Sequence, residues 1–138
     1  MKKISKILLA VLTLFTINLA NIKADEIKVA RINDTDYTSL DEAINAASDE
    51  TTIELLNDET TGMNLNKNII IEGNNKTITF NDKGIALWGK KLTFKNTIIT
   101  MTGVDSTPYT AEWNWQAICA SKNSELNLIN SNMTMDGT

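Results

Sequence analysis

A short pattern of residues occurs twice in this chain, at residues 90–103 (KKLTFKNTIITMTG) and again at 124–137 (SELNLINSNMTMDG). At an offset of 34 the two copies align apolar with apolar residues and asparagine with asparagine, and residues 68–80 form a fainter third copy. Short alternating strands that repeat in this way predict stacked coils, and the stacking allows so short a chain to bury a core. The matched pairs are Leu92 and Leu126, Phe94 and Leu128, Asn96 and Asn130, Ile99 and Met133, Thr100 and Thr134, Met101 and Met135, and Gly103 and Gly137.

From residue 51 onward, apolar and polar residues alternate in short segments bounded by Asn, Gly, Asp or Lys, which is typical of strands separated by turns. The steps from Ile69 to Ile78, Ile85 and Leu92 are 9, 7 and 7 residues, so the pattern returns after 23 residues. Three strands per turn describe one coil of a parallel β-helix, in which each strand pairs about 4.8 Å away with its counterpart one coil later. We therefore expect an all-β solenoid of about three coils in residues 51–138. Its last coil stops before a third strand, so we expect the chain to be truncated there.

The N-terminal segment, residues 1–24, has the features of a secretory signal peptide. Three lysines precede an apolar run at residues 7–20, and Ala24 provides a small residue before a cleavage point. The run is shorter than the roughly 20 apolar residues of a membrane-spanning helix, so we favour a cleaved signal over a retained anchor. The mature protein is then secreted and has no membrane span.

Residues 25–50 are predicted to form an N-terminal cap, with a short strand at residues 28–32 and a helix from Ser39 to Ala47. Ser39 and Glu42 have the spacing of a capping box, in which each side chain accepts a backbone N–H of the first turn. A helix this short is unstable alone in water, so it must dock against the coils. Its docking stripe consists of Leu40, Ala43, Ile44 and Ala47.

The charge balance argues against nucleic acid as a partner. Four of the 13 basic residues and none of the 17 acidic residues lie in residues 1–24, so the remainder has nine basic and 17 acidic residues, a net charge of −8. Binding to phosphates requires clustered Lys and Arg.

The single cysteine, Cys119, cannot form an internal disulfide. It lies in an apolar run and the chain has no histidine to activate it, so we favour a small strand residue over a reactive thiol. No residue pattern indicates a cofactor.

Residues 104–116 lengthen the second coil and account for an offset of 34 rather than 23. Trp113 and Trp115 are two residues apart, so on an extended segment their rings face the same side, and Tyr109 is near them in sequence. Such rings stack on sugars or anchor protein interfaces, which makes these three residues the candidate ligand contacts. The alternative is that the segment folds back and the rings seal the edge of the coil.

Asn96 and Asn130 fall in the same bend of successive coils, where asparagine tolerates the left-handed backbone. We expect them to form a ladder whose side-chain hydrogen bonds bridge coils. The alternative is two unrelated turn residues.

Two segments, YTSLDEAINAASDETTIELLND and NKNIIIEGNNKTITF, resemble the N-terminal portion of pectate-lyase-like right-handed β-helix proteins. The resemblance is greatest to the pectate-lyase-like adhesive domains of Gram-positive surface proteins. It implies a right-handed coil, an extracellular and surface-associated protein, and binding to glycans or host components. The matching residues are Tyr37, Thr38, Ser39 and Leu40; Thr52, Ile53 and Leu55; and Asn68, Ile69, Ile71 and Gly73.

A catalytic site is not apparent in the sequence. Elimination on an acidic polysaccharide requires a base and a group that neutralises the uronate. The only arginine, Arg31, precedes the coils, and the carboxylates are scattered without a calcium-loop spacing. We assign no catalytic residue and no metal ligand, and expect a module for adhesion or ligand binding, its partner a carbohydrate or a host or cell-surface protein. The alternatives are the N-terminal part of a polysaccharide lyase or glycoside hydrolase with its catalytic coils downstream, or a structural spacer.

Overall fold

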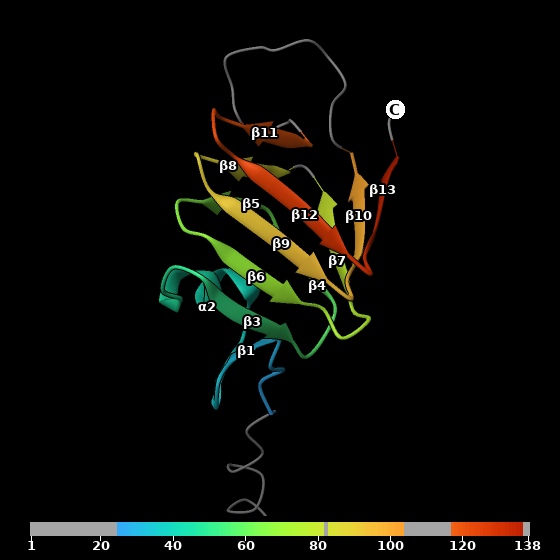
Figure 1. Ribbon diagram of the computed structural model, residues 1–138. Coiled ribbons are helices and arrows are strands. Elements are labelled where there is room, and N and C mark those ends of the chain that lie inside the picture. Colours follow the sequence, from blue (N-terminus) through green and yellow to red (C-terminus); the bar gives the residue numbers. More distant parts are fainter. Residues whose placement is uncertain (1–24, 82, 104–116, 137–138) are drawn as a thin grey trace, which may run out of the picture.

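The computed structural model describes residues 25–81, 83–103 and 117–136, which form a mostly β structure with one short helix (Figure 1). The predicted signal peptide at residues 1–24 lies outside the described residues. The elements are β1 (Ala30–Ile32), β2 (Thr35–Tyr37), α2 (Leu40–Ala46), β3 (Thr51–Leu55), β4 (Glu59–Thr60), β5 (Met63–Leu65), β6 (Ile69–Glu72), β7 (Thr77–Asn81), β8 (Ile85–Leu87), β9 (Lys91–Lys95), β10 (Ile98–Thr102), β11 (Ile118–Ala120), β12 (Glu125–Ile129) and β13 (Asn132–Asp136).

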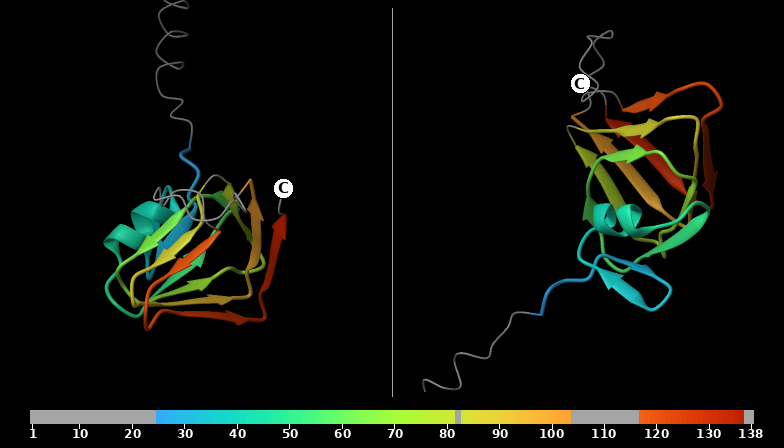
Figure 2. Two further views of the ribbon diagram at one scale, coloured as in Figure 1. Left: turned by 90° about the horizontal axis from the view of Figure 1, so that it is seen from above. Right: turned by 90° about the vertical axis from the view of Figure 1, so that its left-hand side faces the viewer.

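From β3 onward, consecutive strands belong to three different sheets, and each strand pairs in parallel with the strand three positions later (Figures 1 and 2). The six-stranded sheet has the order β12-β9-β6-β3-β1-β2, the four-stranded sheet β13-β10-β7-β4, and the three-stranded sheet β11-β8-β5. The antiparallel pairs in the described part of the chain are the two that β1 forms, with β2 on one side and with β3 on the other.

The register predicted from the repeat is confirmed. Leu92 pairs with Leu126 and Phe94 with Leu128, at the expected offset of 34. In the coil before, Ile69 pairs with Leu92 at an offset of 23. The difference arises between β10 and β11, where residues 104–116 are inserted.

Alternate residues of the parallel strands form buried rows that run across each sheet. One row consists of Ile53, Ile71 and Phe94, which are paired in register and fully buried. Because paired positions of neighbouring strands both carry apolar residues, their side chains contact one another in the core. The burial of this apolar surface stabilises the fold.

The bends that join the six-stranded to the four-stranded sheet use asparagine in the left-handed region. Asn96 and Asn130 both have a φ of 49°, a conformation that asparagine adopts more readily than most residues. The Asn96 side-chain amide donates to Glu72 Oε1 at 2.8 Å, one coil earlier, and its backbone N–H donates to the Ile129 carbonyl at 3.0 Å, one coil later. The bend therefore links the ends of three neighbouring strands, β6, β9 and β12.

The N-terminal cap contains a strand that the sequence did not reveal. β2 pairs antiparallel with β1 through a two-residue turn in which Asn33 has a φ of 51°. None of its three residues is fully buried, so it lacks the alternation by which a strand is recognised. The helix was predicted from Ser39 to Ala47 and is observed from Leu40 to Ala46, with Ser39 as the N-cap.

Candidate ligand-binding groove

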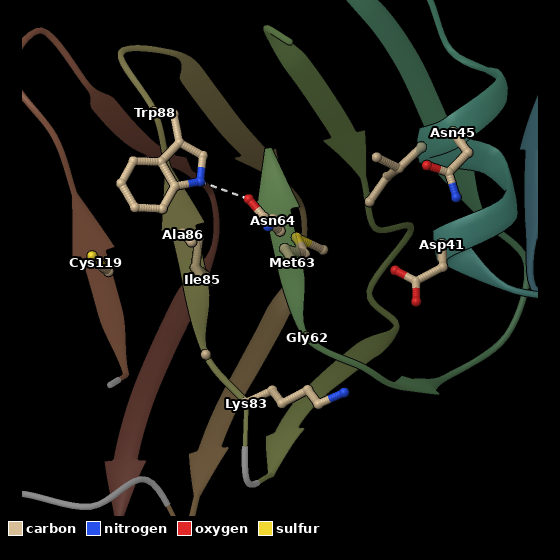
Figure 3. A pocket seen from close by; sticks show the side chains of 12 residues that line it. Asp41, Asn45, Gly62, Met63, Asn64, Lys83, Ile85, Ala86, Trp88 and Cys119 are labelled. Atoms are coloured by element: carbon tan, nitrogen blue, oxygen red, sulfur yellow. Dashed lines mark hydrogen bonds between the residues drawn. The ribbon is translucent and has the colours of Figure 1, made fainter. Parts of the chain in front are cut away.

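A groove lies between α2 and the outer face of the three-stranded sheet (Figure 3). Its volume is about 630 Å³. It is lined from one side by residues of α2 and from the other by residues of β5, β8 and β11 and the turns that flank them.

The floor of the groove is open because small side chains point outward from the sheet. The outward row of the three strands is Asn64, Ala86 and Cys119, paired in register. Gly62 is required beside this row, since a Cβ there would come within 2.6 Å of the Lys83 Cβ. A bulky residue in the row would fill the groove.

Trp88 forms one end of the groove, directly after β8 (Figure 3). Trp88 is 37% exposed. The indole Nε1–H donates to Asn64 Oδ1 at 2.7 Å, which fixes the orientation of the ring and satisfies its polar atom.

The helix forms the opposite wall, where Asp41 and Asn45 lie across from Asn64 and Trp88 (Figure 3). Both are exposed, and they are one helical turn apart, so they share a face. Thr61 Oγ1 lies 3.5 Å from Asp41 Oδ1, a contact that links this wall to the segment leading into β5.

The position of α2 is fixed at both ends. At its start, the Glu42 N–H donates to Ser39 Oγ at 3.1 Å. The Glu42 carboxylate in turn accepts from the Thr38 N–H and the Thr38 hydroxyl at 3.1 and 2.6 Å, one residue earlier than in a standard capping box. At its end, Lys67 Nζ donates to the carbonyls of Ile44 and Ala47.

The charged groups that line the groove are one carboxylate, Asp41, and one ammonium group, Lys83, so the lining is formally neutral. A second carboxylate, Glu59, lies near Asp41 and is partly buried. Burial of Glu59 raises its pKa above the usual range, and the nearby charge of Asp41 adds to the increase, whereas a backbone hydrogen bond from Leu40 opposes it.

The groove has the chemistry of a binding site. It combines an exposed aromatic ring, one carboxylate, two primary amides and one ammonium group on a floor of small residues. In the described parts of the chain, no cluster of three or more Cys, His, Asp or Glu residues could hold a metal ion. Cys119 lines the groove as a partly exposed free thiol.

The four predicted site residues in the described part of the chain do not line the groove. Tyr109, Trp113 and Trp115 belong to residues 104–116, outside the described residues. Asn96 and Asn130 lie in bends between the two larger sheets, and Ser39 and Glu42 hold the start of α2. The cap residues thus act on the groove indirectly, by positioning its helical wall.

The sequence does not reveal the residues that line the groove, because they are of different types and do not recur at a regular spacing. Asn64 and Ala86 are related only by the 22-residue step from β5 to β8. The signal that would have found them is a set of small or polar residues at outward-facing positions in register, with an aromatic residue such as Trp88 nearby in the sequence.

Comparisons with known proteins do not place the chain in a family. No family model, curated protein or solved structure matches it. Within residues 25–81, 83–103 and 117–136, no helix is long and apolar enough to cross a membrane.

Proposed function

We propose that this protein is an extracellular, surface-associated adhesion or binding module that holds carbohydrate in the groove. We further propose that its three sheets form a right-handed parallel β-helix of the pectate-lyase-like type. The observation that carries the binding proposal is the arrangement of the exposed Trp88 ring opposite Asp41 and Asn45.

The chemistry of a sugar ring fits this arrangement. A pyranose has an apolar C–H face and a rim of hydroxyl groups. The Trp88 ring offers a rigid apolar platform whose own N–H is already satisfied by Asn64, so stacking costs it no hydrogen bond. Asp41 and Asn45 offer acceptors and donors for hydroxyl groups on the opposite wall. A few convergent polar groups around an apolar surface are typical of small-ligand sites.

The parallel β-helix proposal is supported by strand order and register. Successive strands visit the three sheets in a fixed rotation, and pairing joins equivalent strands of neighbouring coils. In this arrangement the groove lies on one side of the stack, between the capping helix and the outer face of the three-stranded sheet.

An array of bacterial cell-wall and host glycans, probed with the full chain, tests the binding proposal. For the strongest glycan, Trp88→Ala should weaken affinity at least about tenfold, since a central aromatic contact contributes on the order of 2 kcal/mol. Trp88→Phe keeps an aromatic face and should retain most of the binding. Ile98→Ala changes an apolar residue of similar exposure on a different sheet and is the control.

The predicted contacts in residues 104–116 are tested in the same experiment. Trp113→Ala and Trp115→Ala should leave affinity unchanged if the groove is the binding site. Loss of binding in these two variants, with Trp88→Ala unaffected, would move the site from the groove to the insertion. Absence of binding to every glycan by the folded protein would contradict carbohydrate as the ligand.

A further inference from the structure

The side-chain amide of Asn64 has a fixed orientation in the groove. The Trp88 indole N–H donates to Asn64 Oδ1 at 2.7 Å (Figure 3). An indole nitrogen is only a donor, so the amide atom that it meets is the oxygen. The amide nitrogen, Nδ2, keeps two N–H donors, and no group in the described part of the chain accepts from them. This side chain therefore offers donors to a ligand.

The backbone of Asn64 adds a further donor and one acceptor. β5 is the first strand of its sheet in the sequence, and α2 lies beyond its free edge (Figure 3). The Met63 N–H donates to the Gly84 carbonyl at 3.0 Å, so the backbone groups of Met63 face β8. The Leu65 carbonyl accepts from the Trp88 N–H at 3.3 Å and faces β8 as well. Backbone groups alternate in direction along a strand, so those of Asn64, between these two residues, point to the free edge.

The opposite wall of the groove offers an acceptor. The exposed Asp41 carboxylate lies on α2, across from Asn64 (Figure 3). A carboxylate can accept about four hydrogen bonds. The contact of Asp41 Oδ1 with Thr61 Oγ1, at 3.5 Å, uses one of them and leaves the others for a ligand. The groove therefore has donors on the side of the sheet and a strong acceptor on the side of the helix.

A secondary amide fits between two such walls. It is planar and trans, so its C=O and its N–H point in opposite directions. A carbonyl oxygen directed to Asn64 has two lone pairs, which can accept from Nδ2 and from the backbone N–H, while the amide N–H donates to Asp41. A methyl group on the amide would contact Ala86, the small residue paired with Asn64 in the outward row.

Other substituents of a sugar ring match the two walls less well. A single hydroxyl group bonds through one oxygen atom, whereas the groove, with a volume of about 630 Å³, has room for on the order of 20 water molecules, so its walls are more than one atom apart. An ammonium group would suit Asp41 but would face the donors of Asn64. A carboxylate would suit Asn64 but would be repelled by Asp41.

We propose that the groove selects an N-acetylated amino sugar, whose acetamido group spans the space between Asn64 and Asp41. This inference rests on the proposed function and names the class of sugar. The ring of the same sugar stacks on Trp88, and the Asn64 backbone carbonyl accepts from one of its hydroxyl groups. Affinity then depends on the amide bonds as well as on the aromatic contact.

Titration calorimetry of the full chain with matched short oligosaccharides tests the inference. One series consists of oligomers of N-acetylglucosamine, glucosamine and glucose with the same linkage, and the second series is the corresponding set built on galactose. In at least one series the N-acetylated member should bind at least about tenfold more tightly than the other two. Each of those lacks the amide and leaves polar groups of the groove unpaired.

Asn64→Asp changes the donor and keeps an oxygen that accepts from Trp88. The variant should bind the N-acetylated sugar at least about tenfold more weakly, because a carboxylate replaces the Nδ2 donors. It should bind the amino sugar more tightly at a pH at which the amine is protonated, since carboxylates then lie on both walls. Asn66→Asp is the matched control, because Asn66 is also exposed and directly follows β5 but does not line the groove. Circular dichroism of each variant verifies that it is folded.

The outcomes distinguish this inference from the proposed function. Equal affinity for N-acetylated and parent sugars, still weakened by Trp88→Ala, would overturn the inference and leave carbohydrate binding in the groove intact. A preference for the N-acetylated sugar that persists in folded Asn64→Asp, or that Asn66→Asp abolishes, would overturn it as well. So would binding on the glycan array that is confined to glycans without an acetamido group. Absence of binding to every glycan would contradict the inference and the proposed function together.

Discussion

Lys67 Nζ donates a hydrogen bond to the carbonyl oxygen of Ala47 at 2.7 Å and thereby ties the end of α2 to the turn after β5. The same ammonium group also donates to the carbonyls of Ile44 and Asn45, at 3.1 and 3.0 Å. Carbonyls at the end of a helix have no partner within it, and a cation there is favoured by the helix dipole. One side chain thus completes the hydrogen bonding of the cap and holds the wall of the groove.

We predict that Lys67→Met destabilises the protein. Methionine keeps the apolar stem but removes all three donated bonds, and the loss should lower the free energy of unfolding by about 1–3 kcal/mol. Urea denaturation measures the change, with Lys122→Met, at an exposed position, as the control. If the two variants unfold at the same urea concentration, the lysine does not hold the helix.

The parallel strand register was predictable because equivalent positions of successive repeats carry similar residues. Ile71 and Phe94 pack in the same buried row, so selection for a buried surface leaves the repeat visible in the sequence. The capping helix was predictable for a similar local reason, since Ser39 must supply an acceptor for the Glu42 N–H.

The groove was not predictable, because its floor depends on small side chains that leave space above the sheet. Ala86 and Cys119 have in common only their small size and their register. The helix comes to lie beside the three-stranded sheet only when it docks on the folded protein. Asp41 and Asn64, on the two sides of the groove, are 23 residues apart in the sequence. The sequence neighbours of Trp88 do not show that its ring lines a groove.

Gly73 is predicted to tolerate no side chain. A Cβ on Gly73 would lie 2.7 Å from the Cα of Thr97 and 2.8 Å from the carbonyl oxygen of Asn96, both in the next coil. Backbone atoms cannot move aside without separating the coils, so Gly73→Ala should cost about 1–3 kcal/mol of stability. Thermal unfolding measures this cost.

A second substitution identifies the cause of the Gly73 effect. Thr97→Ala removes the hydroxyl group that a new Cβ would also meet, but leaves the backbone in place. The double variant should therefore stay as unstable as Gly73→Ala, or become less stable. Recovery in the double variant would show that the side chain, and not the approach of the backbone, requires glycine.

Glu42 should contribute a stability that is lost in acid. Hydrogen bonds from the Thr38 hydroxyl, and then from the Thr38 backbone, hold the pKa of Glu42 below its usual range. A carboxyl whose pKa is lower in the folded state stabilises the protein above its unfolded pKa, about 4.3. The contribution falls as the pH decreases toward and through the folded value.

The Glu42 prediction is tested with Glu42→Gln, which has no charge to titrate. Its stability relative to the parent should be lowest near neutral pH, and the two proteins should converge as the pH falls below 4. Chemical denaturation at a series of pH values gives the comparison. A constant difference at every pH would mean that the carboxylate charge has no part in the cap.

Glu59 should show the opposite dependence on pH. Burial, and then the charge of Asp41, raise its pKa, so the folded protein favours the protonated form. A carboxyl whose pKa is raised by folding opposes folding when it is charged, and this cost disappears as the pH falls through the folded value.

Glu59→Gln retains an oxygen that accepts the Leu40 N–H and removes the charge. The variant should therefore be more stable than the parent at neutral pH, and the advantage should vanish at acidic pH. Asp41→Asn should reduce that advantage, because it removes the second carboxylate while Glu59 stays in place. If Glu59→Gln destabilises the protein equally at every pH, the carboxylate serves the start of α2 as a favourable charge, and repulsion from Asp41 is not a significant part of its energy.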